Sequence, residues 1–355
     1  MLQWFTGENL RCVEKVELKD LKRLNVFEGR NGAGKTSILE GMHVLGRGRS
    51  FRTARLSELQ RKGTEFLRVV GATGSSDSPC VIGVERRGRI SEFRVAGARA
   101  ERASVLASRL PQLVIRPESQ ELVSGASEGR RKLLDWVLFH VEQHYGERHA
   151  RFRRVLQQRN SALRSGANTR TLAAWEQEFL EAAETIHAAR ATFFRHHGTK
   201  LCARIAELVG FSVSVEYKAG WDTDVGLEAE LAGSIERDRS LGFSSRGPHR
   251  GDLVLRAMDV KARSVLSRGE SKLTVLGLLL GLADVVKDLG IPPVLLVDDL
   301  ASELDQFARE RFFAAVDMTQ CQTFVSTVDV GLIPDPWRTQ SAVFHVEQGT
   351  VDRVL

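Results

Sequence analysis

One stretch near the N-terminus has the residue types and the spacing of a phosphate-binding loop. It follows the pattern G-x-x-x-x-G-K-T and consists of Gly29, Arg30, Asn31, Gly32, Ala33, Gly34, Lys35 and Thr36, with Ser37 next in the chain. Glycines at these places let backbone N–H groups turn toward phosphate oxygens. A helix that begins directly after the loop adds the positive end of its dipole. The stretch therefore predicts a binding site for ATP or GTP.

Two side chains of this loop have individual roles. Lys35 is a compact charge that reaches the β- and γ-phosphates, and the hydroxyl of Thr36 is placed to ligate Mg²⁺. The flanks agree with the motif, because an apolar run ends at Phe27 and an apolar helical pattern begins at Ser37. The alternative is a glycine-rich turn that matches the pattern by accident.

A pair of acids follows a second apolar stretch. Residues 294–297 are all apolar, which is typical of a buried parallel strand, and Asp298 and Asp299 come directly after them. Ligands of open α/β sheets bind at this end of the strands. We expect Asp298 to hold Mg²⁺ through water, and Asp299 to orient or deprotonate the attacking water. The alternative is a structural pair of acids that ends the strand.

A serine–glycine turn precedes the most apolar helical pattern of the chain. The turn consists of Ser267, Arg268, Gly269 and Glu270. Its hydroxyl, its glycine and the helix dipole together form a second cradle for an anion. The alternative, which the residues alone leave equally open, is a helix cap.

The elements that must position these residues indicate an α/β fold. Alternating apolar residues predict strands at about 13–18, 211–217 and 253–255, hairpins over 66–97, and core strands at 113–115 and 323–327; helices are expected over 37–45 and 273–285. The pattern divides the chain into an α/β segment over 1–115, a mainly helical segment over 116–245 and a second α/β segment over 246–355. The length of 355 residues suggests about two domains.

The longest predicted helix runs over 171–209. Its apolar residues alternate in steps of three and four from Leu172 to Leu208, which is the geometry of helix pairing, and Gly210 ends the pattern. An unbroken helix of this length spans roughly 60 Å and would project as an arm, although Gly198 is a point of possible interruption.

Arginines cluster in two places. One group follows the first helix, at Arg47, Arg49, Arg52 and Arg55, and the other lies on a predicted helix, at Arg148, Arg151, Arg153, Arg154, Arg159 and Arg164. The first group suits phosphates of nucleotide or DNA, and the second is a candidate for DNA binding; both also suit a solvated basic surface. The net charge of +6 favours a polyanionic partner only weakly.

The remaining composition indicates a cytoplasmic protein. The longest apolar run, over 273–286, is interrupted by glycines and Asp284 and is shorter than the ~18 residues of a membrane span. The first residues lack the pattern of a secretory leader. The four cysteines, at positions 12, 80, 202 and 321, have neither paired nor metal-binding spacing, which suits a reducing compartment.

The phosphate loop, the serine–glycine turn and the Asp-Asp strand, in this order, resemble the head domain of ABC and SMC-like ATPases. Within that class the chain is similar to the RecF family of bacterial recombination mediators. The likeness covers nearly the whole chain and is carried by GRNGAGKTSILEG, GRSFRT, VIRPES, LVSGASEGRRKLLD, GPHRGDL, LSRGESK and LLVDDLASELD. It implies an ATPase head made of the two α/β segments, with the helical segment as an inserted arm.

The resemblance also implies an activity. Two heads would enclose two ATP molecules, with Ser267, Arg268, Gly269 and Glu270 of one subunit acting on the nucleotide of the other. ATP-dependent dimerisation on gapped or junction DNA, weak ATP hydrolysis with Mg²⁺, and loading of RecA with RecO and RecR are the expected consequences, in DNA repair, replication and the SOS response to DNA damage.

Three features depart from the pattern of ABC ATPases. Glu270 stands where the signature normally has glutamine, so an extra carboxylate lies near the nucleotide. Glu118 is the nearest candidate for the glutamine loop. The switch histidine is absent, and Ser326 or Thr327 stands near its place, where a hydroxyl would sense the γ-phosphate.

Three other functions remain open. An SMC-like structural tether would bind ATP but barely hydrolyse it. A nucleotide-binding subunit of a membrane transporter is disfavoured by the helical segment, the Asp-Asp pair and the missing histidine. A small-molecule kinase would have no use for the Ser267 turn.

Overall fold

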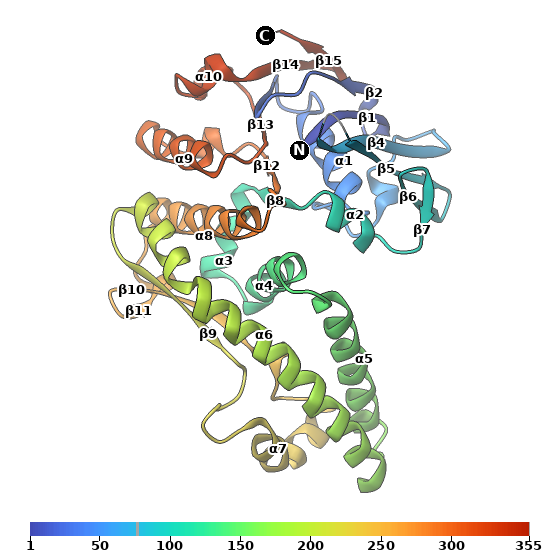
Figure 1. Ribbon diagram of the computed structural model, residues 1–355, viewed down its shortest axis with the longest axis vertical. Coiled ribbons are helices and arrows are strands. Elements are labelled where there is room, and N and C mark those ends of the chain that lie inside the picture. The colour runs from blue at the N-terminus through green and yellow to red at the C-terminus, as the bar shows by residue number, and fades with distance from the viewer. Residues whose placement is uncertain (76–77, 355) are drawn as a thin grey trace. The chain divides into compact units, whose positions relative to one another are not determined.

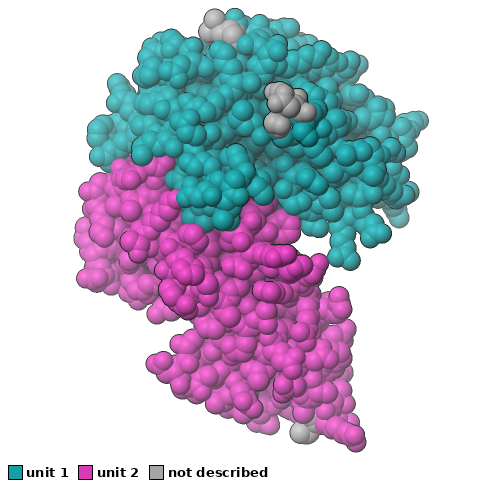
Figure 2. All heavy atoms as spheres, viewed as in Figure 1, with its two compact units in different colours: residues 1–119, 279–355 teal, residues 120–278 magenta. Residues whose placement is uncertain are grey.

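The computed structural model describes residues 1–75 and 78–354, and the chain forms two compact units (Figure 2). The first unit combines Met1–Ser119 with Leu279–Leu355, and the second, Gln120–Leu278, is inserted between these two parts. The insertion begins close to the predicted position 116 but extends well beyond the predicted position 245. The reason is a strand pairing: β10 (Asp252–Ala257) is antiparallel to β9 (Val213–Lys218), so both strands belong to the inserted unit.

A mainly parallel sheet forms the centre of the first unit (Figure 1). In spatial order its strands are β15 (Thr350–Arg353), β14 (Ala342–Glu347), β3 (Leu24–Glu28), β13 (Thr323–Thr327), β12 (Val294–Val297) and β8 (Gln112–Ile115). Only β15 is antiparallel to its neighbour. Every residue of β12 and β13 is buried, as expected for strands covered on both faces.

A second, antiparallel sheet belongs to the same unit. In spatial order its strands are β2 (Val13–Leu18), β1 (Leu2–Leu10), β4 (Phe66–Ser75), β5 (Ser78–Arg87), β6 (Ile90–Val95) and β7 (Ala98–Ala100). The hairpins predicted over 66–97 are confirmed as β4, β5 and β6, while residues 76 and 77 lie outside the described part of the chain.

Helix α1 (Lys35–Arg47) contacts strands of both sheets and joins them through one apolar core (Figure 1). Ile38 and Met42 of α1 lie in this core with Phe5 from the antiparallel sheet and Phe27 and Phe324 from the parallel one, all fully buried. The helix that follows the phosphate loop is therefore held on two sides. The same unit contains α2 (Ser104–Arg109), α9 (Gln306–Thr319), which connects the parallel strands β12 and β13, and α10 (Trp337–Gln340).

The inserted unit is mainly helical. Its helices are α3 (Glu121–Ser124), α4 (Ser127–Val141), α5 (Tyr145–Arg164), α6 (Thr169–Val209) and α7 (Leu227–Leu241), and a small sheet adds β11 (Val260–Lys261) to β10 and β9. Helix α8 (Arg268–Asp288) begins in this unit and ends in the first. Among the residues described, no helix is long and apolar enough to cross a membrane.

The long helix predicted over 171–209 is confirmed. Helix α6 has 41 residues, runs through Gly198 without a break and so spans about 60 Å. The Asn168 side chain caps its first turn, and Gly210 ends it in the left-handed conformation. The predicted apolar seam is buried where α6 packs on its neighbours, for example at Phe179 and Ile186.

Candidate nucleotide site

Three strand ends meet where the predicted nucleotide residues lie. Strands β3, β13 and β12 are neighbours and run parallel, so the phosphate loop after β3 and the acids after β12 lie at the same edge of the sheet. Strand β13 lies between them and contributes Ser326 and Thr327 to this edge. Lys35, Thr36, Asp298 and Asp299 are thus brought together, as the spacing predicted.

The glycines of the phosphate loop permit a backbone that other residues would not adopt. Gly29 has φ +157°, and a Cβ there would lie 2.1 Å from the carbonyl oxygen of Val346. Gly34 has φ +121°, and its Cβ would lie 2.9 Å from the side chain of Val13. Both positions therefore require glycine, for conformation and for space.

The side chain of Lys35 turns back toward the start of the phosphate loop. Its Nζ donates hydrogen bonds to the carbonyl oxygens of Gly29, at 2.6 Å, and Arg30, at 3.0 Å. Burial lowers the pKa of this ammonium, while the carboxylates of Asp299 and Asp298 raise it. The ammonium is therefore placed where phosphate oxygens would meet the loop.

Asp298 is the best candidate for a metal ligand. Its Oδ1 accepts hydrogen bonds from Thr36 Oγ1, at 2.8 Å, and from Ser326 Oγ, at 2.7 Å. Burial raises the pKa of Asp298, and the two hydroxyls act against this rise. A largely buried carboxylate next to a threonine hydroxyl is a set of hard oxygen donors, which fits Mg²⁺, an ion that usually binds one or two protein groups together with phosphates and water.

Asp299 has an unusual backbone conformation. Its φ is +47°, in the left-handed region that residues with a Cβ seldom adopt. Its N–H donates to Ser326 Oγ at 2.9 Å, and Ser302 Oγ lies 2.9 Å from its carbonyl oxygen and 3.1 Å from its Oδ1. Strained residues of this kind cluster at functional sites.

The arginine-bearing loop after α1 is fastened to that helix by a buried acid. Glu40 has no exposed surface and accepts two hydrogen bonds from Arg11, at 3.1 and 3.2 Å, and one from Ser50 Oγ. Ser50 Oγ in turn accepts from the N–H groups of Arg52, at 2.9 Å, and Thr53, at 3.0 Å. Glu40 could not be identified from the sequence, because an acid in an amphipathic helix gives no sign of burial.

The four arginines of this loop do not have the same environment. Arg47 is half-buried, and burial lowers its pKa to about 10. Arg49, Arg52 and Arg55 are exposed. Burial raises the pKa of Asp298, and the positive charge of Arg52 acts against this rise. Arg52 is therefore a candidate for contact with nucleotide phosphates.

The serine–glycine turn lies in the inserted unit and is a helix cap. Ser267, Arg268 and Gly269 are exposed. The Ser267 N–H donates to Glu270 Oε2 at 2.8 Å, and the Glu270 N–H donates to Ser267 Oγ at 3.3 Å. This reciprocal pair is a capping box at the start of α8. Its hydrogen bonds lower the pKa of Glu270.

Glu118 and Thr327, the remaining candidates, make fewer contacts that point to a nucleotide. Glu118 lies in a short turn with its side chain 60% exposed, 3.8 Å from Arg116. Thr327 Oγ1 donates to the carbonyl oxygen of Asp329 at 2.9 Å.

The arginines of α5 divide into two groups. Five of them are exposed, namely Arg148, Arg151, Arg153, Arg154 and Arg164. Arg159 is fully buried and pairs with Asp238 at 2.8 Å and Glu176 at 2.9 Å. Its inclusion among the candidates for DNA contact was wrong, because its charge is used inside the unit.

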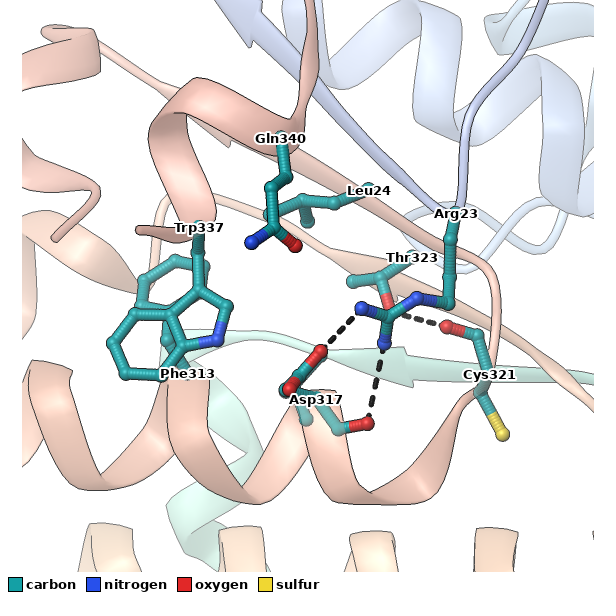
Figure 3. A pocket seen from close by; sticks show the side chains of 9 residues that line it. Arg23, Leu24, Phe313, Asp317, Cys321, Thr323, Trp337 and Gln340 are labelled. Carbon is teal, nitrogen blue, oxygen red and sulfur yellow. Dashed lines mark hydrogen bonds and ion pairs between the residues drawn. The ribbon is translucent and has the colours of Figure 1, made fainter. Parts of the chain in front are cut away.

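A small groove lies at the opposite edge of the parallel sheet (Figure 3). It has a volume of about 80 Å³ and is lined by residues at the beginnings of β3 and β13 and on α9 and α10, including Arg23, Asp317 and Trp337. Arg23 donates to Asp317, and Thr323 Oγ1 donates to the Cys321 carbonyl oxygen at 3.2 Å (Figure 3). The groove lies at the N-terminal ends of the strands, whereas the predicted nucleotide residues follow their C-terminal ends.

The chain is similar to proteins of one described family. The family model described as RecF/RecN/SMC N terminal domain matches residues 1–352. The chain is 37% identical over 351 residues to the DNA replication and repair protein RecF of Thioalkalivibrio sulfidiphilus (strain HL-EbGR7), covering 96% of each chain. It is 38% identical over 353 residues to the protein of that name from Pseudomonas aeruginosa (strain LESB58), covering 97% of this chain and 95% of the other.

Solved structures agree on the fold. A structure described as the recombination mediator protein RecF-ATPrS in the RecFOR pathway has a TM-score of 0.88 at 22% identity and covers 100% of this chain and 98% of that one. An Smc head bound to the C-winged helix domain of ScpA has a TM-score of 0.59 at 15% identity, covering 99% and 96%. These likenesses confirm the expected ATPase-head fold with an inserted helical arm.

Proposed function

Because the chain belongs to the RecF/RecN/SMC family, and within it to the RecF proteins of DNA replication and repair, we propose that it is a DNA-binding switch controlled by ATP. The observation that carries this proposal is the meeting of Lys35, Thr36, Asp298 and Asp299 at one sheet edge. A solved RecF structure of the same fold is described with an ATP analogue, which supports ATP as the nucleotide.

The chain's own residues account for binding. The loop from Gly29 to Ser37 would surround the phosphates with backbone N–H groups, and Lys35 would contact the β- and γ-phosphates. Thr36 and Asp298 would hold Mg²⁺, which neutralises and orients the phosphates when bound. Arg52 would add a second positive charge from the loop that Glu40 fastens.

The signature turn would complete the site from a second subunit. Ser267, Arg268 and Gly269 are exposed at the N-terminus of α8, where a helix dipole favours an anion. We therefore infer an ATP-dependent homodimer in which this turn of one subunit meets the γ-phosphate bound by the other. Closure of the dimer would depend on the triphosphate, and hydrolysis would release it.

Hydrolysis requires a base near the attacking water, and Asp299 has this role in the proposal. Aspartate is one methylene shorter than glutamate, and Ser302 engages the Asp299 carboxylate. Both features favour slow turnover. A structural tether that binds ATP but barely hydrolyses it is the second candidate function, and the Ser302 contact is the observation that favours it. ATP turnover stimulated by gapped DNA distinguishes the two.

DNA is the proposed partner of the dimer. The net charge of +6 and the exposed arginines of α5 support contacts with the phosphate backbone. Gaps or junctions between single and double strands, cooperation with RecO and RecR, and loading of RecA follow from the family and belong to the proposal. So does a cytoplasmic location.

Sedimentation of the purified protein, with and without ATP and gapped duplex, tests nucleotide, dimer and DNA together. The Lys35→Ala protein should lose nucleotide affinity by roughly tenfold or more, because a hydrogen bond to a charged group contributes about 1.5–3 kcal/mol. Its dimer on DNA should disappear at ATP concentrations that saturate the unmodified protein. Lys19→Ala, an exposed lysine of the same unit, is the matched control. A Lys35→Ala protein that still dimerises on DNA with ATP would contradict the proposal.

A further inference from the structure

We propose that Ser326 is a positioning residue of the nucleotide site, whose hydroxyl couples the carboxylate of Asp298 to the backbone of Asp299 and so directs the Asp299 side chain. This inference rests on the proposed function, since it takes Asp298 and Asp299 as the acids of an ATPase. It assigns Ser326 a defined role in place of the general expectation that a hydroxyl at the end of β13 senses the γ-phosphate.

The strand register places Ser326 beside the acids. In the parallel pairing of β12 with β13, Val297 is opposite Val325, so the next residue of each strand brings Asp298 level with Ser326. On the other side, β13 pairs with β3, where Ser326 is opposite Phe27, two residues before the phosphate loop begins. The serine is therefore central to the site by topology.

The hydroxyl of Ser326 donates one hydrogen bond to Asp298 and accepts another from Asp299. It is fully buried, donates to Asp298 Oδ1 at 2.7 Å and accepts from the Asp299 N–H at 2.9 Å. A hydroxyl has a single proton to donate, so the bond to Asp298 fixes the direction of its lone pairs. Those lone pairs are then available to the Asp299 N–H, which links the two contacts.

The link extends to the phosphate loop. Thr36 Oγ1 donates to the same Oδ1 atom of Asp298 that Ser326 engages. Thr36 and Asp298 are the residues that would hold a cation, whose positive charge would stabilise the Asp298 carboxylate. The hydroxyl of Ser326 therefore links this pair to the Asp299 N–H through one oxygen atom. No proton leaves Ser326 in this scheme.

Asp299 is the residue for which such a coupling matters. Its φ of +47° lies in the left-handed region that residues with a Cβ seldom adopt, so the contacts around it help to hold this conformation. The hydrogen bond from its N–H to Ser326 is one of those constraints. Without it the peptide between Asp298 and Asp299 is free to relax, and the carboxylate of Asp299 would point elsewhere. A misplacement of a reacting group by about 1 Å can slow a chemical step by roughly 100-fold.

The test compares two deletions of a buried hydroxyl from one strand. Ser326→Ala removes the coupling. Thr323→Val removes a hydroxyl at the other end of β13, where Thr323 is 1% exposed and its hydroxyl donates to the Cys321 carbonyl oxygen in the groove of Figure 3. Both changes cost some stability, so loss of packing alone affects both proteins. Ser326→Cys, with a weaker donor of similar size, should lie between Ser326→Ala and the unmodified protein.

Three measurements separate positioning from a structural role. In Ser326→Ala, the affinity for a fluorescent ATP analogue with Mg²⁺ should stay within about threefold, while the turnover number falls by about tenfold or more. Hydrogen exchange at the Asp299 amide should become faster, because its acceptor is gone. Thr323→Val should change none of the three. Turnover in Ser326→Ala that equals that of Thr323→Val, or affinity that falls in parallel with turnover, would overturn the inference.

A failure of the proposed function remains distinguishable. If the unmodified protein binds ATP without hydrolysing it, hydrogen exchange decides the question. Addition of ATP with Mg²⁺ should then alter protection of the Asp299 amide in the unmodified protein and leave that of Ser326→Ala unchanged. An equal response in both proteins would show that Ser326 does not couple the two acids. If ATP does not bind at all, both proposals fail together.

Discussion

At the residue scale, Glu270 has a physical role that its place in the signature does not suggest. The sequence presents it as an extra carboxylate where the family of ABC ATPases has glutamine. In the structure it accepts from the Ser267 N–H and completes a capping box. The pattern S-x-x-E was visible in the sequence and would have predicted this contact. Both alternatives considered for the turn, a cap and an anion cradle, therefore use the same atoms.

Glu270→Gln is expected to make ATP-dependent association easier. Glutamine can also complete a capping box, so the helix start is kept, while the negative charge that competes with a phosphate is removed. The ATP concentration for half-maximal association should fall by about two- to fivefold, measured by sedimentation. Glu236→Gln, an exposed acid of the same unit, carries the same change of charge and should have no effect. A higher ATP requirement in Glu270→Gln would refute this role.

His43 should make the first unit sensitive to acid. Burial lowers its pKa to about 3, far below the ordinary value of 6.5. Between these two values the unfolded chain binds a proton that the folded chain does not, so stability falls as the pH falls. From pH 7 to pH 5 the loss from this histidine is about 2 kcal/mol. His43→Gln should show a smaller drop of the urea midpoint over this interval, and His345→Gln, exposed on β14, should keep the full drop.

Local sequence is enough to propose a site residue when that residue follows a recognisable strand. Lys35, Thr36 and Asp298 could be assigned from local spacing, since a glycine-rich loop and an acid after an apolar run carry their own context. The bridge through Ser326 could not be assigned, because it depends on β13 lying between β3 and β12. That order is a property of the tertiary structure and leaves no mark in local sequence.

At the element scale, the strength of the periodic pattern decided which elements could be found. The 41 residues of α6 repeat an apolar seam over many turns, and the helix was predicted within two residues of its start. Strand β1 was not identified, because two of its buried positions are Gly7 and Asn9 rather than apolar residues. The close packing there favours glycine at position 7, since a Cβ would lie 2.7 Å from a side-chain carbon of Leu10. The sequence also predicts neither β14 nor β15, although Gln348 and Gly349 form the turn between them.

Two family motifs of the inserted unit are joined by one ion pair. Arg130 of the GRRKLLD segment donates to both carboxylate oxygens of Asp252 in GPHRGDL, at 2.8 and 3.0 Å. It also donates to the carbonyl oxygens of Leu122 and Gly125. The motifs are therefore parts of one contact between α4 and β10.

Arg130→Met should destabilise the inserted unit by about 3 kcal/mol, because it leaves a partly buried carboxylate and two carbonyl groups without their donor. Lys132→Met on the same helix removes an exposed pair with Glu128 and should cost less than about 0.5 kcal/mol. Urea denaturation followed by circular dichroism measures both. Equal midpoints for the two variants would show that the Arg130 pair contributes little.

At the scale of the whole molecule, the distribution of charge bears on DNA binding, and the order of the strands along the chain bears on folding during synthesis. The exposed arginines of α5 support the proposed contact with DNA, and such a contact has a measurable signature. Each phosphate that a protein neutralises releases counterions, so the logarithm of the binding constant falls with the logarithm of salt concentration by about 0.9 per contact.

Arg148→Gln together with Arg154→Gln should reduce this slope by about two and weaken binding to gapped DNA at low salt. Arg89→Gln together with Arg99→Gln changes the net charge equally and is the matched control; both arginines are exposed, Arg89 in the turn between β5 and β6 and Arg99 on β7. Fluorescence anisotropy across a salt series measures both slopes. The same slope for the two double variants would exclude α5 as a specific contact.

The position of β3 has a consequence for how the protein is made. Its two neighbours in the sheet, β13 and β14, come from residues 323–347, whereas the inserted unit is complete at Leu278. A ribosome that synthesises the chain therefore releases the whole arm before the strand that carries the phosphate loop has any partner. The inserted unit can begin to fold during synthesis, whereas the parallel sheet of the first unit can form only after β13 and β14 have been synthesised. A premature stop codon before β13 would leave β3 without both of its neighbouring strands and the nucleotide site incomplete.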